Sequence, residues 1–287
     1  MIAQVILNGF ITGLTLALPA IALTLSYSIL KFANFAIGAM LTLGAYFALI
    51  LNVMLHVPLL FAAIGACALL AMTLIATDRL VFAKLRDRTA ITLLVASIGV
   101  SFVLENIARL IFGNSSYNFD VAVIGGYQRW NLRFNAEQAY TAITAFAAMI
   151  AVYILLSHTR LGRSMKAVAD NPALAAVRGI DREAVIRATW AVNGLLLGAA
   201  GVLVGLERGI DPLLGWSYLV SVFAAAILGG LGSPVGAVLG AVTIGIVQEL
   251  STLVISPNYR EATGFVTIAF ILLLRPQGLL GTVRLRK

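Results

Sequence analysis

Residues 158–187 read HTRLGRSMKAVADNPALAAVRGIDREAVIR, and they separate two long apolar segments of the chain. The stretch contains six lysines and arginines and three acidic residues, whereas the flanking segments, 138–157 and 188–206, contain no charged residue. Apolar segments of about 20 residues on both sides of a charged loop are typical of a chain that crosses a membrane before and after that loop. We refer to residues 158–187 as the basic loop.

Three residues inside the basic loop mark the ends of a short helix. Asn171 is a favoured N-cap residue, Pro172 suits the first helical position, and Gly179 suits the position just past a helix end. A compact helix kept in a cytosolic loop of a membrane protein is well placed to contact a soluble partner. We therefore interpret the basic loop as a docking loop and not as a catalytic site.

The composition is that of an integral membrane protein. Hydrophobic residues make up 61% of the chain and charged residues 11%, whereas soluble domains have roughly 45–50% and about 25%. Apolar segments in lipid must be helices or barrel strands, and these segments lack the alternation of barrel strands. With about 20 residues per span, the sequence predicts an all-α bundle of about eight or nine transmembrane helices, which forms one transmembrane domain over residues 1–287.

The positive charges are clustered in three segments. Four lysines and arginines lie in 79–88, six in 160–187 and four in 275–287, and the positive-inside rule places all three segments in the cytosol. Counting crossings back from residue 79 puts the N-terminus outside and the C-terminus inside. The formal charge of +8 is explained by this topology, so nucleic acid is not expected as a partner.

Residues 30–38, LKFANFAIG, place Lys31 and Asn34 between two apolar half-runs. One interpretation ends the first helix near Pro19 and makes residues 31–35 the unwound centre of a broken helix, which membrane proteins tolerate where protein or a water-filled cavity surrounds it. The other interpretation is a tight cytosolic turn between two ordinary helices, and hydropathy does not separate the two. In the first case, the candidate pathway residues are Phe32, Asn34 and Phe35.

A second irregular segment, residues 218–231, has fourteen residues and is too short for a full crossing. It leads into GGLGSPVG at 229–236, whose glycines and proline predict a short helix followed by a re-entrant turn. The phrase IGAML at 37–41 resembles VGAVL at 235–239 in type and order. These five matched positions suggest an internal repeat of the kind that transporters use.

Two rows of glycines recur at helical spacing. Small residues three or four positions apart let helix backbones approach closely in lipid, so we interpret both rows as helix contacts, with pore lining as the alternative. The first row is Gly194, Gly198, Gly201 and Gly205, and the second is Gly232, Gly236 and Gly240.

Glu105 and Arg109 are charged residues within a predicted span, and each charge at the centre of a membrane costs about 2.5–3.5 kcal/mol. Because they are four residues apart with the glutamate first, they can form an ion pair on one helix face. One interpretation is a self-satisfied pair near the outer end of the span. The other places Glu105 and the adjacent Asn106 on a solute pathway.

Motifs for catalysis are missing from the sequence. It has no Gly-Lys pair and hence no P-loop, and it has neither an HExxH helix nor a Gly-x-Ser-x-Gly elbow. Cys67 stands alone, and His56 and His158 are far apart, so no metal site is expected. We expect a chain that is not an enzyme and that binds no cofactor or metal of its own.

Several phrases along the chain are distinctive together. They are GLTLA at 13–17, NFAIG at 34–38, TRLGRSMKAVADNP at 159–172, GGLGSPVGAVLG at 229–240 and RPQGLLG at 275–281. Each phrase alone is modest, but in their order and spacing they resemble permease subunits of ATP-binding-cassette (ABC) importers of the high-affinity branched-chain amino acid type. The chain departs from many relatives around Asn34, which weakens inference about the solute.

The resemblance implies a heteromeric importer in the bacterial inner membrane. A second permease subunit would complete the pathway, two cytosolic ATPase subunits would bind ATP and magnesium, and a periplasmic or lipid-anchored binding protein would deliver the solute. Membrane lipids would surround the chain. The basic loop would be the coupling loop on an ATPase, and its candidate residues are Arg160, Gly162, Arg163, Lys166, Asn171, Pro172, Ala175, Ala176 and Gly179.

The resemblance leaves the solute open. Branched-chain amino acids are the expected solutes, and urea, short amides and aromatic carboxylates are the alternatives. An ion-coupled secondary transporter is a rival hypothesis of another class. It would explain the charges within the spans but gives no role to the capped helix of the basic loop.

Overall fold

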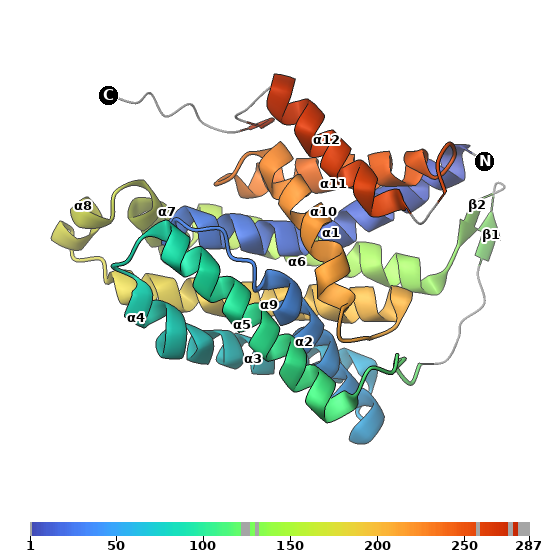
Figure 1. Cartoon of the computed structure of the whole chain (residues 1–287), viewed down its shortest axis with the longest axis horizontal. Helices are drawn as coiled ribbons and strands as arrows, with labels where there is room; N and C mark the ends of the chain where they lie inside the picture. Colours follow the sequence, from blue (N-terminus) through green and yellow to red (C-terminus); the bar gives the residue numbers. More distant parts are fainter. Residues whose placement is uncertain (1, 122–126, 130–131, 257–258, 275–277, 281–287) are drawn as a thin grey trace.

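The computed structural model describes residues 2–121, 127–129, 132–256, 259–274 and 278–280, which form a bundle of helices (Figure 1). Within these residues, seven helical stretches are long and apolar enough to cross a membrane. They are α1 (Ile2–Leu30), α2 (Ile37–Leu49) continued by the π-helix η1 (Ile50–Met54), α3 (Leu59–Thr77) continued by the π-helix η2 (Asp78–Phe82) and α4 (Ala83–Leu85), α5 (Ala90–Phe112), α6 (Ala136–His158), α9 (Arg182–Arg208) and α11 (Pro234–Ser251). Two shorter apolar helices are α10 (Leu214–Gly229) and α12 (Arg260–Leu274). The predicted all-α polytopic bundle is confirmed.

A small antiparallel hairpin lies in the connection between α5 and α6. Its strands are β1 (Tyr127–Arg129) and β2 (Leu132–Phe134). The basic loop forms two further short helices, α7 (Arg160–Asp170) and α8 (Pro172–Val177). The hairpin and these two helices lie at opposite ends of the long axis of the bundle (Figure 1).

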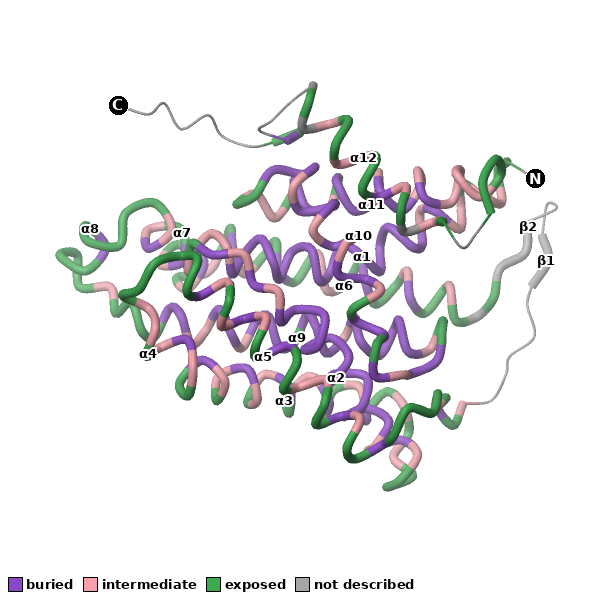
Figure 2. Tube along the Cα trace, viewed as in Figure 1, coloured by how far each residue is buried: buried purple, intermediate pink, exposed green. Residues whose placement is uncertain are grey.

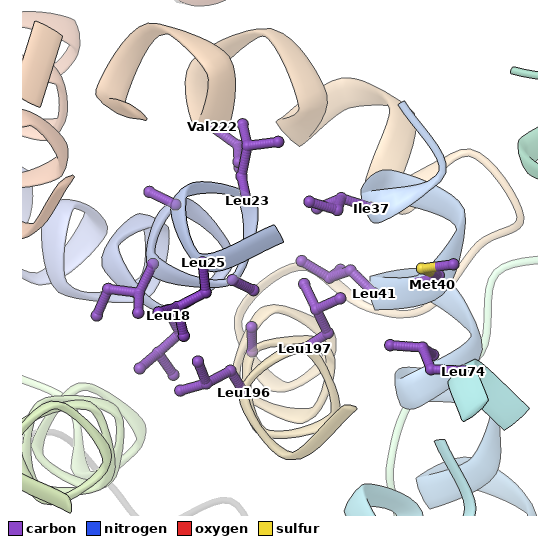
Figure 3. Close-up of a cluster of buried hydrophobic side chains, with 14 of the residues drawn as sticks. Leu18, Leu23, Leu25, Ile37, Met40, Leu41, Leu74, Leu196, Leu197 and Val222 are labelled. Atoms are coloured by element: carbon purple, nitrogen blue, oxygen red, sulfur yellow. The ribbon is translucent and has the colours of Figure 1, made fainter. Parts of the chain in front are cut away.

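The core lies around α1, α2 and α9, which are buried over most of their length, whereas α3, α5 and α6 bury one face and expose the other (Figure 2). The exposed faces carry large apolar side chains such as Leu110, which is 87% exposed. Such faces carry no penalty in lipid, which is as apolar as leucine. The side chains that meet at the centre are Leu18, Leu23, Leu25, Ile37, Met40, Leu41, Leu74, Leu196, Leu197 and Val222 (Figure 3).

The first helix is continuous through Pro19, so the interpretation that ends it there is wrong. Proline removes one backbone hydrogen bond from a helix. In a membrane bundle, neighbouring helices and small local adjustments satisfy the freed carbonyl. Pro19 is buried among such neighbours.

The glycines of α9 lie where neighbouring chain segments come close. A Cβ at Gly194 would overlap the backbone of α3, and a Cβ at Gly198 would lie 2.8 Å from the Cα of Cys67, which is also in α3. A Cβ at Gly201 would lie 2.8 Å from a backbone nitrogen of α2. A Cβ at Gly205 would lie 2.9 Å from the side chain of Ile210, which follows α9. This row of glycines therefore lets α9 pack closely against both α2 and α3.

The second glycine row is divided between a turn and a helix. Gly236 and Gly240 lie on α11, and a Cβ at Gly240 would lie 2.8 Å from the backbone nitrogen of the last residue of α10. Gly232 precedes the helix and has a φ of 105°, so its predicted place in a helical row is wrong. The helix begins later because Ser233 caps it and Pro234 occupies its first turn.

The short segment predicted at 218–231 corresponds to α10, which begins at Leu214 and ends at Gly229. The chain then turns at residues 230–233 and returns as α11. The two similar phrases, 37–41 and 235–239, lie at the starts of α2 and α11, and both contact α10. The two halves of the proposed repeat thus have α10 as a common neighbour.

Candidate functional site

The basic loop contains the helix that the sequence predicts. The Asn171 side chain accepts a hydrogen bond from the backbone nitrogen of Leu174 at 3.0 Å, and Pro172 is the first residue of α8. Gly179 follows the helix with a φ of 79°, a conformation that favours glycine. These local signals are sufficient to form α8 at this place in the chain.

The preceding helix, α7, was not predicted. Thr159 caps it by accepting a hydrogen bond from the backbone nitrogen of Gly162 at 3.0 Å. Gly162, Met165 and Val168 are buried at intervals of three, and a Cβ at Gly162 would overlap the last turns of α6. The spacing of these three residues and the capping residue Thr159 are the features of the sequence that could have predicted α7. The outward face of α7 carries the cations Arg160, Arg163 and Lys166.

The six residues of α8 are mostly exposed and apolar. Leu174 is 55% exposed and Val177 is 85% exposed, and Ala176 is also exposed, whereas Ala175 is buried. Figure 1 shows α8 at the far end of the bundle, beyond the membrane-crossing helices. Groups of exposed large apolar side chains are typical of surfaces that bind another protein.

Other charged segments lie at the same end of the bundle as α7 and α8. The Lys31 Nζ donates a hydrogen bond to the backbone oxygen of Ala169 at 2.7 Å. The Arg86 guanidinium contacts both carboxylate oxygens of Asp78, at 2.8 and 2.9 Å, and it also pairs with Glu183 at the start of α9. We refer to Asp78, Arg86 and Glu183 as the Arg86 cluster. Most of the third cationic segment, residues 275–287, lies outside the described residues.

The Arg86 cluster holds the end of the helical stretch formed by α3, η2 and α4 against the first turn of α9. The side chains of Asp78 and Arg86 are 3% and 9% exposed, so this ion pair is shielded from water. Burial lowers the pKa of Arg86, but the hydrogen bonds to Glu183 and Asp78 outweigh that effect and raise it above its ordinary value. The guanidinium is therefore always charged, and Asp78 always has its partner.

Residues 31–36 are not helical, and Phe32, Asn34 and Ala36 among them are buried. Lys31 has a φ of 61°, and the backbone nitrogen of Phe35 donates to Ser97 Oγ at 3.0 Å, about two turns inside α5. The start of α2 meets the first turn of α10, where the backbone nitrogen of Gly215 donates to Thr42 Oγ1 at 2.8 Å. The blue trace between α1 and α2 in Figure 1 follows this path.

This path distinguishes the two interpretations of the segment. α10 begins just after the end of α9, while Lys31 is next to α7 at the opposite end of the bundle. Six residues in extended form cover up to about 20 Å, which is enough to carry the chain from that end into the interior of the bundle. The residues form an unwound segment that enters the bundle and not a tight turn between two helices. We refer to residues 31–36 as the unwound segment.

Asn34 lies at the centre of the unwound segment and is completely buried. Its Oδ1 accepts a hydrogen bond from the backbone nitrogen of Ala36 at 3.0 Å. Its Nδ2 has no hydrogen-bond partner among the described residues. A buried amide donor without a partner costs about 1–3 kcal/mol, so such a group needs an explanation.

Aromatic rings connect the unwound segment with the Arg86 cluster. Phe32 packs on Phe82 with ring centres 5.5 Å apart, and Phe82 stacks on Trp190 at 5.4 Å. Phe35 packs on Phe223 of α10 at 4.7 Å. Because Phe82 ends η2 and Asp78 begins it, the same π-helix positions both the ring stack and the ion pair.

The charged pair on α5 forms as its spacing predicts. Glu105 Oε1 and Arg109 Nη2 are 2.8 Å apart. Asn106 is exposed, and its Nδ2 donates to the backbone oxygen of Phe102 at 2.8 Å. These residues lie eight or more positions beyond Ser97, or about 12 Å further along α5, so the structure does not bring them to Asn34.

Two further kinds of polar contact were not predicted as pairs. Glu249 of α11 and Arg260 of α12 form an ion pair at 2.5 Å. Asn193 Nδ2 donates to Ser26 Oγ at 2.6 Å, and Gln248 of α11 bonds to α10 in the same manner. Partners so far apart in sequence leave no local signal.

Among the described residues, no group of histidine, cysteine or acidic side chains could hold a metal ion.

Comparisons with known proteins agree with this geometry. Residues 5–274 match a family described as the permease component of the branched-chain amino acid transport system. The LivH high-affinity branched-chain amino acid transport permease of Escherichia coli is 31% identical over 99% of this chain and 97% of its own length. The BraD permease of Pseudomonas aeruginosa is 29% identical with the same coverage.

A solved structure shows a similar fold. PsaBC from Streptococcus pneumoniae in complex with Fab matches with a TM-score of 0.50 over 94% of this chain and 91% of that chain, at 13% sequence identity. At this identity the match shows the arrangement of helices alone.

Proposed function

This chain belongs to the family of permease components of branched-chain amino acid transport systems, and on that premise we propose how its structure moves a solute. The chain is the transmembrane permease subunit of an ABC importer, and its solutes are branched-chain amino acids. It does no chemistry on the solute. Its work is to change access to a pathway when partner ATPases bind and hydrolyse ATP.

The proposed assembly contains a second permease, two ATPase subunits and a solute-binding protein. The ATPases sit on the end of the bundle that carries α7, α8 and the Arg86 cluster, which is the cytosolic end by the positive-inside rule. The N-terminus, at the opposite end of α1, then lies outside. The binding protein delivers the solute at that outer end.

The observation that carries the docking proposal is the exposed apolar surface of α8. Leu174 and Val177 project from a helix that is capped at both ends and lies outside the membrane-crossing helices. The cations Arg160 and Arg163 are exposed on α7, the helix that precedes α8. An apolar centre with a charged rim is the usual composition of a protein interface.

The pathway proposal rests on Asn34. Its buried Nδ2, which has no hydrogen-bond partner in the part of the chain that the structure describes, lies in a segment without helical hydrogen bonds, where a small rearrangement would expose backbone and amide groups together. Such groups suit the carboxylate or polar end of an amino acid during passage. Phe32 and Phe35 flank Asn34 and supply apolar surface for the solute side chain. Glu105 and Asn106 would face the pathway further toward the outer end.

A docking test uses charge and polarity changes at the α7–α8 surface. We expect Leu174→Asp, and separately the pair Arg160→Glu with Arg163→Glu, to lower copurification of the ATPase by more than about tenfold. Uptake of labelled leucine into proteoliposomes containing the whole assembly should fall with it. Arg88→Glu, an exposed charge reversal in another loop of the same end, is the matched control.

Intact ATPase association and uptake in both α7–α8 variants would show that the docking proposal is wrong. Uptake that continues without the ATPase and stops when the ion gradient is collapsed would instead support the ion-coupled transporter.

A further inference from the structure

A groove of about 440 Å³ runs along the outside of the bundle between α1, α6 and α11. Its walls are apolar and include Ile21 of α1, Phe146 and Tyr153 of α6, and Val238 of α11. Phe146 and Tyr153 are 45% and 56% exposed. The groove is therefore open to the surroundings and is not part of the closed core.

The length of the groove corresponds to one leaflet of the membrane. Along α6 it extends from Phe146 to Ser157, eleven residue steps or about 16 Å of helix. Half of a hydrocarbon core about 30 Å thick is about 15 Å. Ser157 is at the end of α6 next to the basic loop, so the groove spans the cytosolic leaflet.

Among the described residues that line the groove, one is charged, and it lies at the cytosolic end. This is Lys166, which projects from α7. It is exposed, and it forms no ion pair within the described part of the chain. None of the described lining residues is acidic. The site thus combines an apolar channel with a positive charge at the level of the lipid headgroups.

We propose that this groove binds an acyl chain of an anionic phospholipid from the cytosolic leaflet, with the phosphate held by Lys166. Basic pockets between transmembrane helices on the cytosolic side select anionic headgroups.

The proposal gives Lys166 a role separate from ATPase docking. It goes beyond the transport function, because a bound lipid would attach α7 to the membrane at a defined place. Binding of the lipid can also be measured without any transport.

The test is lipid retention by the purified assembly, measured by native mass spectrometry. The assembly is stripped of lipid, and phosphatidylglycerol or phosphatidylethanolamine with identical acyl chains is added back. We expect the wild type to retain about fivefold more phosphatidylglycerol than phosphatidylethanolamine. In Lys166→Gln this ratio, which we call the preference, should be near one. Lys84→Gln removes an exposed cation from the same end but not from the groove, so its preference should equal that of the wild type.

A second variant tests the groove itself. Val238→Trp fills the channel and should lower retention of both lipids, provided that the assembly still elutes as one species. An equal preference for the two lipids in the wild type, or equal loss in Lys84→Gln and Lys166→Gln, would overturn the proposal.

A cross-linking experiment tests for another occupant. A single cysteine at Val238, in a Cys67→Ser background, should label with a photoreactive phospholipid. Cross-linking of that cysteine to the second permease would overturn the proposal. If leucine uptake is absent but lipid selectivity is present, the transport proposal fails and the lipid site stands.

Discussion

Replacement of Arg86 by methionine is expected to destabilise the protein through Asp78. The substitution keeps most of the length of the side chain but removes the group that contacts both oxygens of Asp78, at 2.8 and 2.9 Å. The Asp78 side chain is 3% exposed, so water cannot take the place of the guanidinium. Removal of one partner of a buried ion pair costs about 3–5 kcal/mol. We expect about 3 kcal/mol, because the cluster lies at the end of the bundle.

The contact between Arg86 and Glu183 provides an internal control. Glu183 is 53% exposed, and an exposed ion pair contributes about 0–1 kcal/mol. Glu183→Gln should therefore have a small effect. The double variant Arg86→Met with Asp78→Asn removes both buried charges and should recover at least about 2 kcal/mol of the loss.

The measurement is the free energy of unfolding of the purified chain in a detergent titration, together with the apparent melting temperature of the assembled complex. A double-mutant cycle over Arg86 and Asp78 gives their interaction energy. If Arg86→Met and Glu183→Gln destabilise equally, or if the double variant is no more stable than Arg86→Met, the buried pair does not hold the end of the α3–η2–α4 stretch in place.

Three further predictions concern the pathway and the packing. Asn34→Ala should leave the melting temperature within a few degrees of the wild type and lower leucine uptake by about tenfold, whereas unchanged uptake would remove Asn34 from the pathway. Gly201→Val should destabilise by about 1–3 kcal/mol or more because its side chain would overlap the backbone of α2, while Gly99→Val, which meets open space, should not. Asn193→Ala removes a hydrogen bond between α9 and α1 and should cost only about 0.6 kcal/mol in the same unfolding titration, so a loss several times larger would indicate a second role.

The parts of this protein that sequence predicts are those with local causes. The all-α bundle follows from composition because lipid leaves the backbone few alternatives. Asn171, Pro172 and Gly179 each act on residues within one helical turn, so α8 could be placed to within two residues. The pair of Glu105 with Arg109 is also local, since helix geometry alone brings the two side chains together.

The parts that sequence left open depend on contacts between distant segments. The unwound segment is held by Ser97 and Phe223, whose distances in sequence leave no pattern near Asn34. The Arg86 cluster joins three separate segments in the same way. The interpretation that ends the first helix near Pro19 was wrong because a proline ends isolated helices but is tolerated where neighbouring helices surround it. The helix α7 was missed because eleven residues with many charges resemble a loop until their buried face is known.

The hydrogen bond from Lys31 to Ala169 has a mechanical consequence. Ala169 is near the end of α7, and α8 follows it directly, while Lys31 is the first residue of the unwound segment. A movement of α8 larger than the reach of the Lys31 side chain must either break this hydrogen bond or pull on the backbone of Lys31, three residues before Asn34. If α8 docks an ATPase and Asn34 lies on the pathway, as proposed above, one flexible side chain joins the two places, and no relay through the rigid helices is required.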